Sequence, residues 1–148
     1  MSAAHIHLLL NHIPILGSLF GLLLLLYAML KGSDEMKRVC FGIFVITALI
    51  TIPVYLTGDG AARIIQNLPG VSEDIIRQHD SAATFTIIAV ELLGAASLLG
   101  WWLTRKGKKL VGWLLVTVFV LAIISTGLGM WTGNLGGQIR HTEVRAQT

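Results

Sequence analysis

The sequence predicts an all-α integral membrane protein, a four-helix bundle built from two similar helical hairpins with both termini outside the cytoplasm. Hydrophobic residues make up 54% of the 148-residue chain, whereas charged residues make up only 13%. The mean hydropathy of +0.75 is far above that of a soluble domain. These values exclude an ordinary water-soluble enzyme and direct attention to the longest apolar stretches.

Four apolar stretches are each long enough to cross a bilayer, which takes about 20 residues of helix. They cover residues 8–30, 39–56, 82–103 and 110–131. The first stretch is too long for a secretory signal and has no lysine or arginine before it, so we expect it to remain in the protein. The chain, residues 1–148, is therefore predicted to form a single four-span transmembrane domain.

Lysine and arginine are concentrated in the two short connections, which follow the first and the third span. Because such residues mark cytoplasmic loops, we expect a multi-pass protein of the bacterial inner membrane with both termini in the periplasm. The net charge of +3 is then explained by membrane insertion and gives no indication of nucleic-acid binding. Seven of the eleven basic residues lie in these connections: Lys31, Lys37, Arg38, Arg105, Lys106, Lys108 and Lys109.

The outer ends of the second and fourth spans resemble each other. Residues 57–64 read TGDGAARI, and residues 132–139 read TGNLGGQI. An amide followed by a histidine also occurs near the start of the first span, at Asn11-His12, and of the third, at Gln78-His79. We therefore expect two hairpins in parallel repeat, related by an axis along the membrane normal. The alternative is that Thr-Gly pairs, which are common at helix ends, coincide here by chance.

All five histidines fall on the predicted outer side. His12 and His79 lie at the boundaries of spans, where an ionisable side chain usually marks a site. If the repeat is real, the two imidazoles face each other across the bundle, as the axial ligands of a b-type haem do. His5, His7 and His141 are candidates for a second metal position. The chain has no C-x-x-C-H motif, so non-covalent haem b, one or two copies, is favoured over c-type haem.

Three arginines on the same outer side, Arg63, Arg77 and Arg140, are suited to binding the propionates of a haem. Alternatively, they are interfacial residues whose charged ends are solvated. Imidazole also binds copper, zinc and non-haem iron, so histidine clustering alone does not select the metal. The histidines could also anchor the interface or bond backbone carbonyls without holding any metal.

Glu91 is the only charged residue inside a predicted span and is expected near the middle of the membrane. A carboxyl group there is costly to ionise and usually has a role. We expect a neutral, hydrogen-bonded carboxyl that takes part in packing, and we favour this over proton transfer because no chain of partners is recognisable in the sequence.

Several segments resemble a family of small, uncharacterised bacterial four-span membrane proteins with a histidine-rich periplasmic end. These segments are 5–14 (HIHLLLNHIP), 56–58 (LTG), 79–80 (HD), 91–92 (EL) and 136–141 (GGQIRH). The likeness covers nearly the whole chain, and the family resembles small b-type cytochrome subunits. It implies a fold and recurring histidine positions, here His12, His79 and His141, and no particular reaction. Ile13 stands where the family usually has Phe, a difference with no expected effect on ligation.

Two functions fit these features. In the first, the chain is a membrane electron-transfer subunit that binds b-type haem through His12 and His79 near the periplasmic face. It would exchange electrons with a periplasmic cytochrome c, a quinone or a larger membrane complex. In the second, it is a non-catalytic accessory subunit of such a complex, and its histidines bind another metal, a chlorin or nothing. A transporter is disfavoured because few polar groups line the spans.

Overall fold

The computed structural model describes residues 2–105 and 112–141, and nearly all of them are helical. No strand occurs within these two ranges, so the all-α prediction is confirmed. The helices are α1 (Ala3–Leu10), α2 (His12–Leu30), α3 (Asp34–Ile65), α4 (Glu73–Arg105) and α5 (Gly112–Arg140).

Four helical segments are long and apolar enough to cross a membrane, and α1 and α2 together make the first of them, Ala3–Leu30. The helices extend beyond the predicted apolar stretches. α3 continues past residue 56 to Ile65, and α4 begins at Glu73 rather than at residue 82. The stretch between the second and third apolar segments is thus mostly the ends of two long helices. The predicted start of the fourth stretch, residues 110–111, lies outside the described residues.

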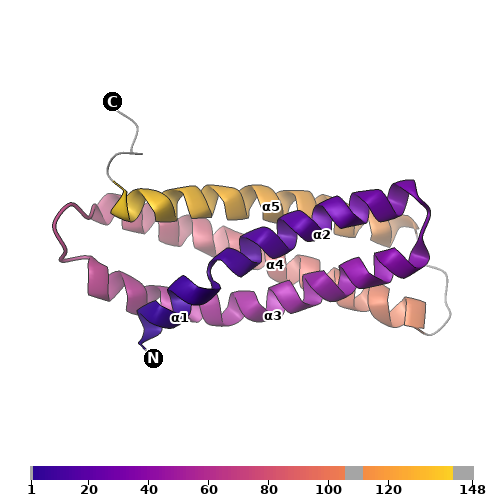
Figure 1. Ribbon diagram of the computed structural model, residues 1–148, viewed down its shortest axis with the longest axis horizontal. Helices are drawn as coiled ribbons and strands as arrows, with labels where there is room; N and C mark the ends of the chain where they lie inside the picture. The colour runs from indigo at the N-terminus through magenta and orange to yellow at the C-terminus, as the bar shows by residue number, and fades with distance from the viewer. Residues whose placement is uncertain (1, 106–111, 142–148) are drawn as a thin grey trace.

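The long helices form a four-membered bundle in which α2 and α4 each pack against both α3 and α5, while α1 packs on α3 (Figure 1). The α2–α3 turn lies at one end of the bundle. The start of α1, the α3–α4 connection and the end of α5 lie at the other (Figure 1). We call the latter the histidine end, because the five histidines lie on α1, at the start of α2, near the start of α4 or directly after α5.

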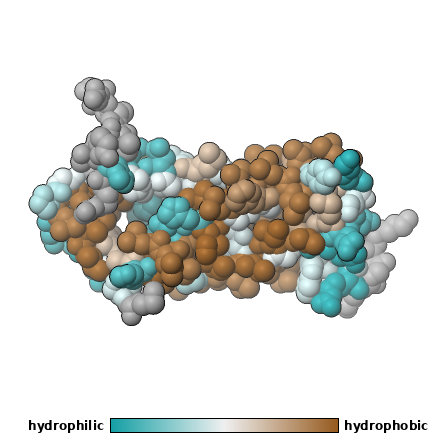
Figure 2. Space-filling model, viewed as in Figure 1, coloured by the Kyte–Doolittle hydropathy of each residue, from teal (hydrophilic) through white to brown (hydrophobic). Residues whose placement is uncertain are grey.

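The surface of the bundle carries a broad hydrophobic band between two more hydrophilic ends (Figure 2). Large side chains on this band are more than half exposed, among them Phe20, Ile46, Phe85 and Val116. A water-soluble bundle would bury such residues, whereas lipid is a suitable environment for them. The surface therefore fits a multi-pass membrane protein.

A break at Asn11 separates α1 from α2, and Pro14 explains it. Proline lacks the N–H that would bond the carbonyl of Leu10, and its ring clashes with that carbonyl in a continuous helix. Pro14 instead lies in the first turn of α2, where the missing N–H costs little. The break leaves His7 and His12 on two different helices.

Small residues allow the helices to approach closely around a core that includes Leu25, Phe41 and Leu93. Gly21 of α2 lies against the ring of Phe44 on α3, and Gly94 of α4 lies against Ala48. Gly21 thus has a packing role between α2 and α3.

Candidate functional site

His79 lies in the first turns of α4 and is held by the neighbouring helix α5. Its side chain is half-buried, and Nδ1 lies 3.0 Å from the carbonyl oxygen of Thr132. Because a carbonyl can only accept, Nδ1 carries the proton and donates this hydrogen bond. In the neutral ring the other nitrogen, Nε2, then keeps its lone pair. The imidazole of His79 is therefore held in one orientation, with Nε2 as its free acceptor nitrogen in the neutral form.

His7 of α1 is held in the same way by α3. Its Nδ1 lies 2.9 Å from the carbonyl oxygen of Val54, and the side chain is half-buried. The hydroxyl of Thr57 donates to this carbonyl as well, at 3.1 Å, and to the carbonyl of Pro53 at 2.7 Å. The neutral form of His7 therefore also presents an unprotonated Nε2.

The structure brings His7 and His79 to the same end of the bundle, within electrostatic range of each other. His7 on α1 bonds a carbonyl of α3, and His79 on α4 bonds a carbonyl of α5. In each case the bond joins the two spans of one hairpin at the histidine end. The two carbonyls are not at equivalent positions of the repeated segments. Thr132 corresponds to Thr57, whereas His7 bonds Val54, which lies about one helical turn before Thr57. His7 thus shares with His79 a hydrogen bond to the following membrane-spanning helix, and the pairing of His79 with His12 or His7 stays a prediction.

The other predicted histidines are more exposed. His5 lies on α1, where its backbone N–H donates to Ser2, and its side chain faces outward. His12 is the first residue of α2 and is exposed. His141 follows the last turn of α5 and is also exposed, and its backbone N–H bonds Gly137. The side chains of His5 and His12 make no hydrogen bond, among the described residues, of the kind that orients His7 and His79.

Glycines lie beside both half-buried imidazoles. A Cβ atom at Gly136 would meet Cε1 of His79 at 3.1 Å, and a Cβ at Gly58 would meet Cε1 of His7 at 3.7 Å. The rings therefore lie almost directly on the backbones of α5 and α3. A larger residue at position 136 would push the imidazole of His79 out of place.

Asn11 adds a polar group that has no partner. Its side-chain oxygen Oδ1 is buried and accepts no hydrogen bond from the described residues. The backbone N–H of Asn11 bonds the carbonyl of His7, so the two residues are one helical turn apart on the same face. Buried polar atoms are normally hydrogen-bonded, so Oδ1 of Asn11 is an acceptor that the described residues leave unused.

Two of the predicted arginines, Arg63 and Arg77, have exposed side chains at this end. Arg77 is exposed and paired with Asp74 at 2.6 Å, and Gln78 donates to the same carboxylate. Arg63 is exposed near the end of α3. The side chain of Arg140 lies outside what the structure describes. Of the two, Arg63 is therefore better suited to bind an anionic group at the histidine end.

The two hydrogen-bonded imidazoles, of His7 and His79, could serve a metal that takes few ligands from the protein. Within residues 2–105 and 112–141, no three histidine, cysteine, aspartate or glutamate side chains come together as a metal site. A structural zinc ion takes four such ligands. Haem iron already has four nitrogen ligands and takes only its axial ligands from the protein. Two oriented imidazoles are fewer ligands than a structural zinc ion takes, and they equal the number that a haem iron takes from a protein when both axial ligands are residues.

Comparisons with known proteins give no assignment. No protein-family model, curated protein or solved structure matches the chain. The resemblance of residues 5–14 and 136–141 to small four-span membrane proteins therefore stays an expectation. The function has to be argued from the geometry of His7 and His79.

Proposed function

We propose that this chain is a membrane electron-transfer subunit that binds b-type haem at the histidine end, with His79 and His7 as axial ligands. The observation that carries the proposal is the shared hydrogen-bonding pattern. Each Nδ1–H donates to a backbone carbonyl of the adjacent helix, and each Nε2 is left able to bind iron. This is the arrangement by which proteins usually fix ligating histidines.

The residues of the chain would orient the ligands, tune their basicity and exclude water. The carbonyls of Val54 and Thr132 polarise the two rings and make each Nε2 a stronger electron donor. Thr132 is itself fixed, because its hydroxyl bonds that of Thr86 at 2.8 Å across α4 and α5. Haem bound there would supply one-electron chemistry, with a potential that these contacts and the apolar bundle help to set.

The remaining predicted residues have secondary places in this proposal. His12 is the alternative partner for His79, and His5 and His141 are candidates for a second haem. Arg63 and Arg140 are the arginines proposed to neutralise propionates. If the basic loops lie in the cytoplasm, the haem faces the periplasm, where a cytochrome c, a quinone or a larger membrane complex could exchange electrons with it.

Visible absorption of the purified full-length protein tests the proposal. We expect a sharp α-band on reduction with dithionite, which His79→Ala and His7→Ala each abolish. His12→Ala decides between the two pairings, since it keeps the band if His7 is the second ligand. Circular dichroism and gel filtration of every variant separate loss of haem from loss of fold.

Two results would overturn the proposal. A protein that stays colourless after expression with added haem precursor, and after addition of hemin, would leave the accessory-subunit function in its place. A band that survives His7→Ala and disappears in His12→Ala would return the axial pair to His12 and His79. Metal analysis of a colourless preparation would then detect copper, zinc or non-haem iron.

A further inference from the structure

The helix that carries His7 is held to the bundle less tightly than the other helices. α1 contains no fully buried residue, whereas each of the other four helices contributes several residues to the buried core of the described bundle. Leu8 and Leu9 of α1 are each 67% exposed. Segments with few buried apolar contacts open at a lower free-energy cost than the core of a protein does. α1 is therefore the helix that separates from this bundle most easily.

A joint at Asn11 connects α1 to α2. The backbone N–H of Asn11 still bonds the carbonyl of His7, but Pro14 has no N–H to offer the carbonyl of Leu10. The two helices accordingly point in different directions (Figure 1). Hinges in proteins are usually a few residues at the ends of such elements. Asn11 is thus placed to act as a hinge between α1 and the rest of the protein.

The contacts that dock α1 on α3 lie at His7 and at the start of the helix. Nδ1 of His7 donates to the carbonyl of Val54 at 2.9 Å, and the ring lies beside Gly58. A Cβ atom at Gly60 would lie only 2.6 Å from the Cβ of Ala3. α1 therefore reaches α3 only because position 60 has no side chain.

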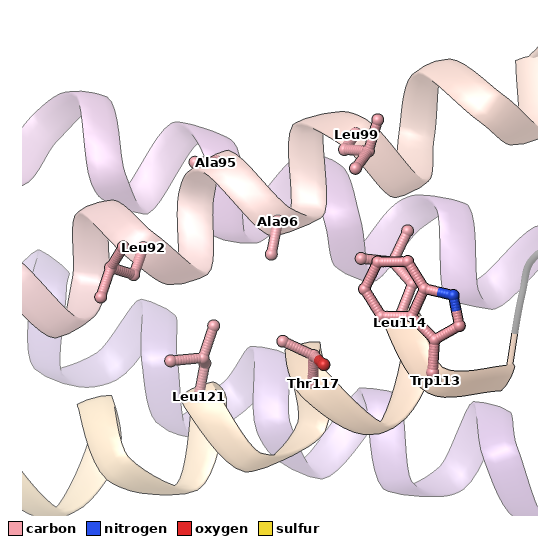
Figure 3. Close-up of a pocket in the computed structure, with 8 residues that line it drawn as sticks. All are labelled: Leu92, Ala95, Ala96, Leu99, Trp113, Leu114, Thr117 and Leu121. Atoms are coloured by element: carbon pink, nitrogen blue, oxygen red, sulfur yellow. The ribbon is translucent and has the colours of Figure 1, made fainter.

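The groove between α4 and α5 does not lead to the histidine end (Figure 3). Its volume is about 410 Å³, and its lining includes Leu92 and Leu99 from α4 and Leu121 from α5. Leu92 follows His79 by 13 residues, which is about 20 Å of helix. Access to His79 is therefore expected at the histidine end itself, where α1 packs on α3.

We infer that α1 is a hinged strap, which opens at Asn11 to admit haem to His79 and closes when His7 and His79 share that haem. The inference rests on the proposed function. His7 moves with α1, whereas His79 belongs to α4 and stays with the bundle. Opening therefore separates the two imidazoles, and closing brings them together again. A ligand that needs both imidazoles binds only the closed form, so it holds the strap shut.

Distances between two spin labels on the full-length protein in lipid nanodiscs test the hinge. Leu9→Cys on α1 and Ile46→Cys on α3 put the labels at exposed positions, and the natural cysteine, Cys40, is buried and stays unlabelled. Without haem, we expect a docked distance and a second, broader population from the open strap. Addition of hemin should lower the open population by about tenfold or more, because binding selects the closed form. The α-band after reduction records haem binding in the same samples.

A matched pair of glycine variants shifts the strap without touching a histidine. Gly60→Ala should raise the ratio of open to docked protein by about tenfold, because its methyl group overlaps that of Ala3. Gly42→Ala is the control on the same helix, since a Cβ atom there would meet nothing within 4 Å. It should leave the ratio unchanged. Circular dichroism and gel filtration confirm that both variants are folded.

The inference fails on any of three results. A single docked distance in haem-free samples of both the parent and Gly60→Ala would show that α1 does not open. Equal ratios in Gly60→Ala and Gly42→Ala would show that docking on α3 does not control the second population. An open population that persists in samples with bound haem would show that His7 does not close the strap.

The same measurements separate this inference from the proposed function. A protein that stays colourless with hemin would overturn the proposed function, and closure by haem with it. The distances in the haem-free parent and in Gly60→Ala would still decide whether α1 opens. A haem-bound protein with one fixed distance under all conditions would keep the proposed function and remove the strap.

Discussion

The Nδ1–H of His79 donates a hydrogen bond to the carbonyl oxygen of Thr132, 3.0 Å away, and this bond joins α4 to α5 at the histidine end. The ring also lies against the backbone of α5 at Gly136. One helical turn of α5, from Thr132 to Gly136, therefore both orients the imidazole and limits its position.

Gly136→Ala should disturb His79, whereas Gly58→Ala should leave His7 in place. The new methyl group would lie 3.1 Å from Cε1 of His79 but 3.7 Å from Cε1 of His7, which is an ordinary contact distance. Overpacking of this kind costs about 1–3 kcal/mol. We expect Gly136→Ala to lower the free energy of unfolding in detergent by about that amount and Gly58→Ala to lower it by less. Equal effects would mean that the ring of His79 moves aside freely.

The hydroxyls of Thr86 and Thr132 should be energetically coupled. They are 2.8 Å apart, and one of them donates to the other across α4 and α5. Hydrogen bonds between membrane helices average about 0.6 kcal/mol in double-mutant cycles. We expect a coupling of that size between Thr86→Val and Thr132→Val, measured by unfolding in detergent.

The matched control for this cycle pairs Thr86 with Thr126. The hydroxyl of Thr126 donates to Ala122 in its own helix, so it offers no bond to α4. The free-energy changes of Thr86→Val and Thr126→Val should therefore add. A coupling as large as that of the Thr86–Thr132 pair would show that the cycle reports general loosening of the bundle.

The helices of this fold could be predicted from the sequence because four apolar stretches are a strong signal on their own. The helix ends could not, since residues 57–65 and 73–81 contain polar residues that read as a loop. They are helical because α3 and α4 pack against each other along their length. Hydropathy indicates which residues contact lipid, and it does not indicate contacts between helices.

The hydrogen-bonded arrangement of His7 was not predicted either. An amide before a histidine at Asn11-His12 and Gln78-His79 favoured His12, but that pattern ignores which face of the helix is buried. Pro14, Ser18, Gly21, Leu25 and Ala28 are the buried residues of α2. Extending their spacing toward the N-terminus leads to Asn11 and then to His7. This periodicity was a signal available in the sequence, whereas the carbonyl partners Val54 and Thr132 depend on packing.

The orientation of the protein can be tested with two exposed positions at opposite ends. Asn67 lies in the α3–α4 connection, and Glu35 lies at the start of α3 beside the basic residues Lys37 and Arg38. If the basic end is cytoplasmic, an impermeant maleimide added to intact spheroplasts should label Asn67→Cys. Glu35→Cys should react only after the cells are opened. The opposite pattern would place the histidines in the cytoplasm and exclude a periplasmic electron donor.

Close packing in the middle of the bundle should make Gly94 far less tolerant than Gly127. A Cβ atom at Gly94 would meet the methyl group of Ala48 on α3 at less than contact distance, whereas a Cβ at Gly127 would meet nothing within 4 Å. We expect Gly94→Ala to lower the free energy of unfolding by about 1–3 kcal/mol through overpacking. Gly127→Ala should be neutral or stabilising, because alanine favours a helix over glycine by about 1 kcal/mol. Unfolding by denaturing detergent measures both, and a stable Gly94→Ala variant would mean that α3 and α4 can separate without cost.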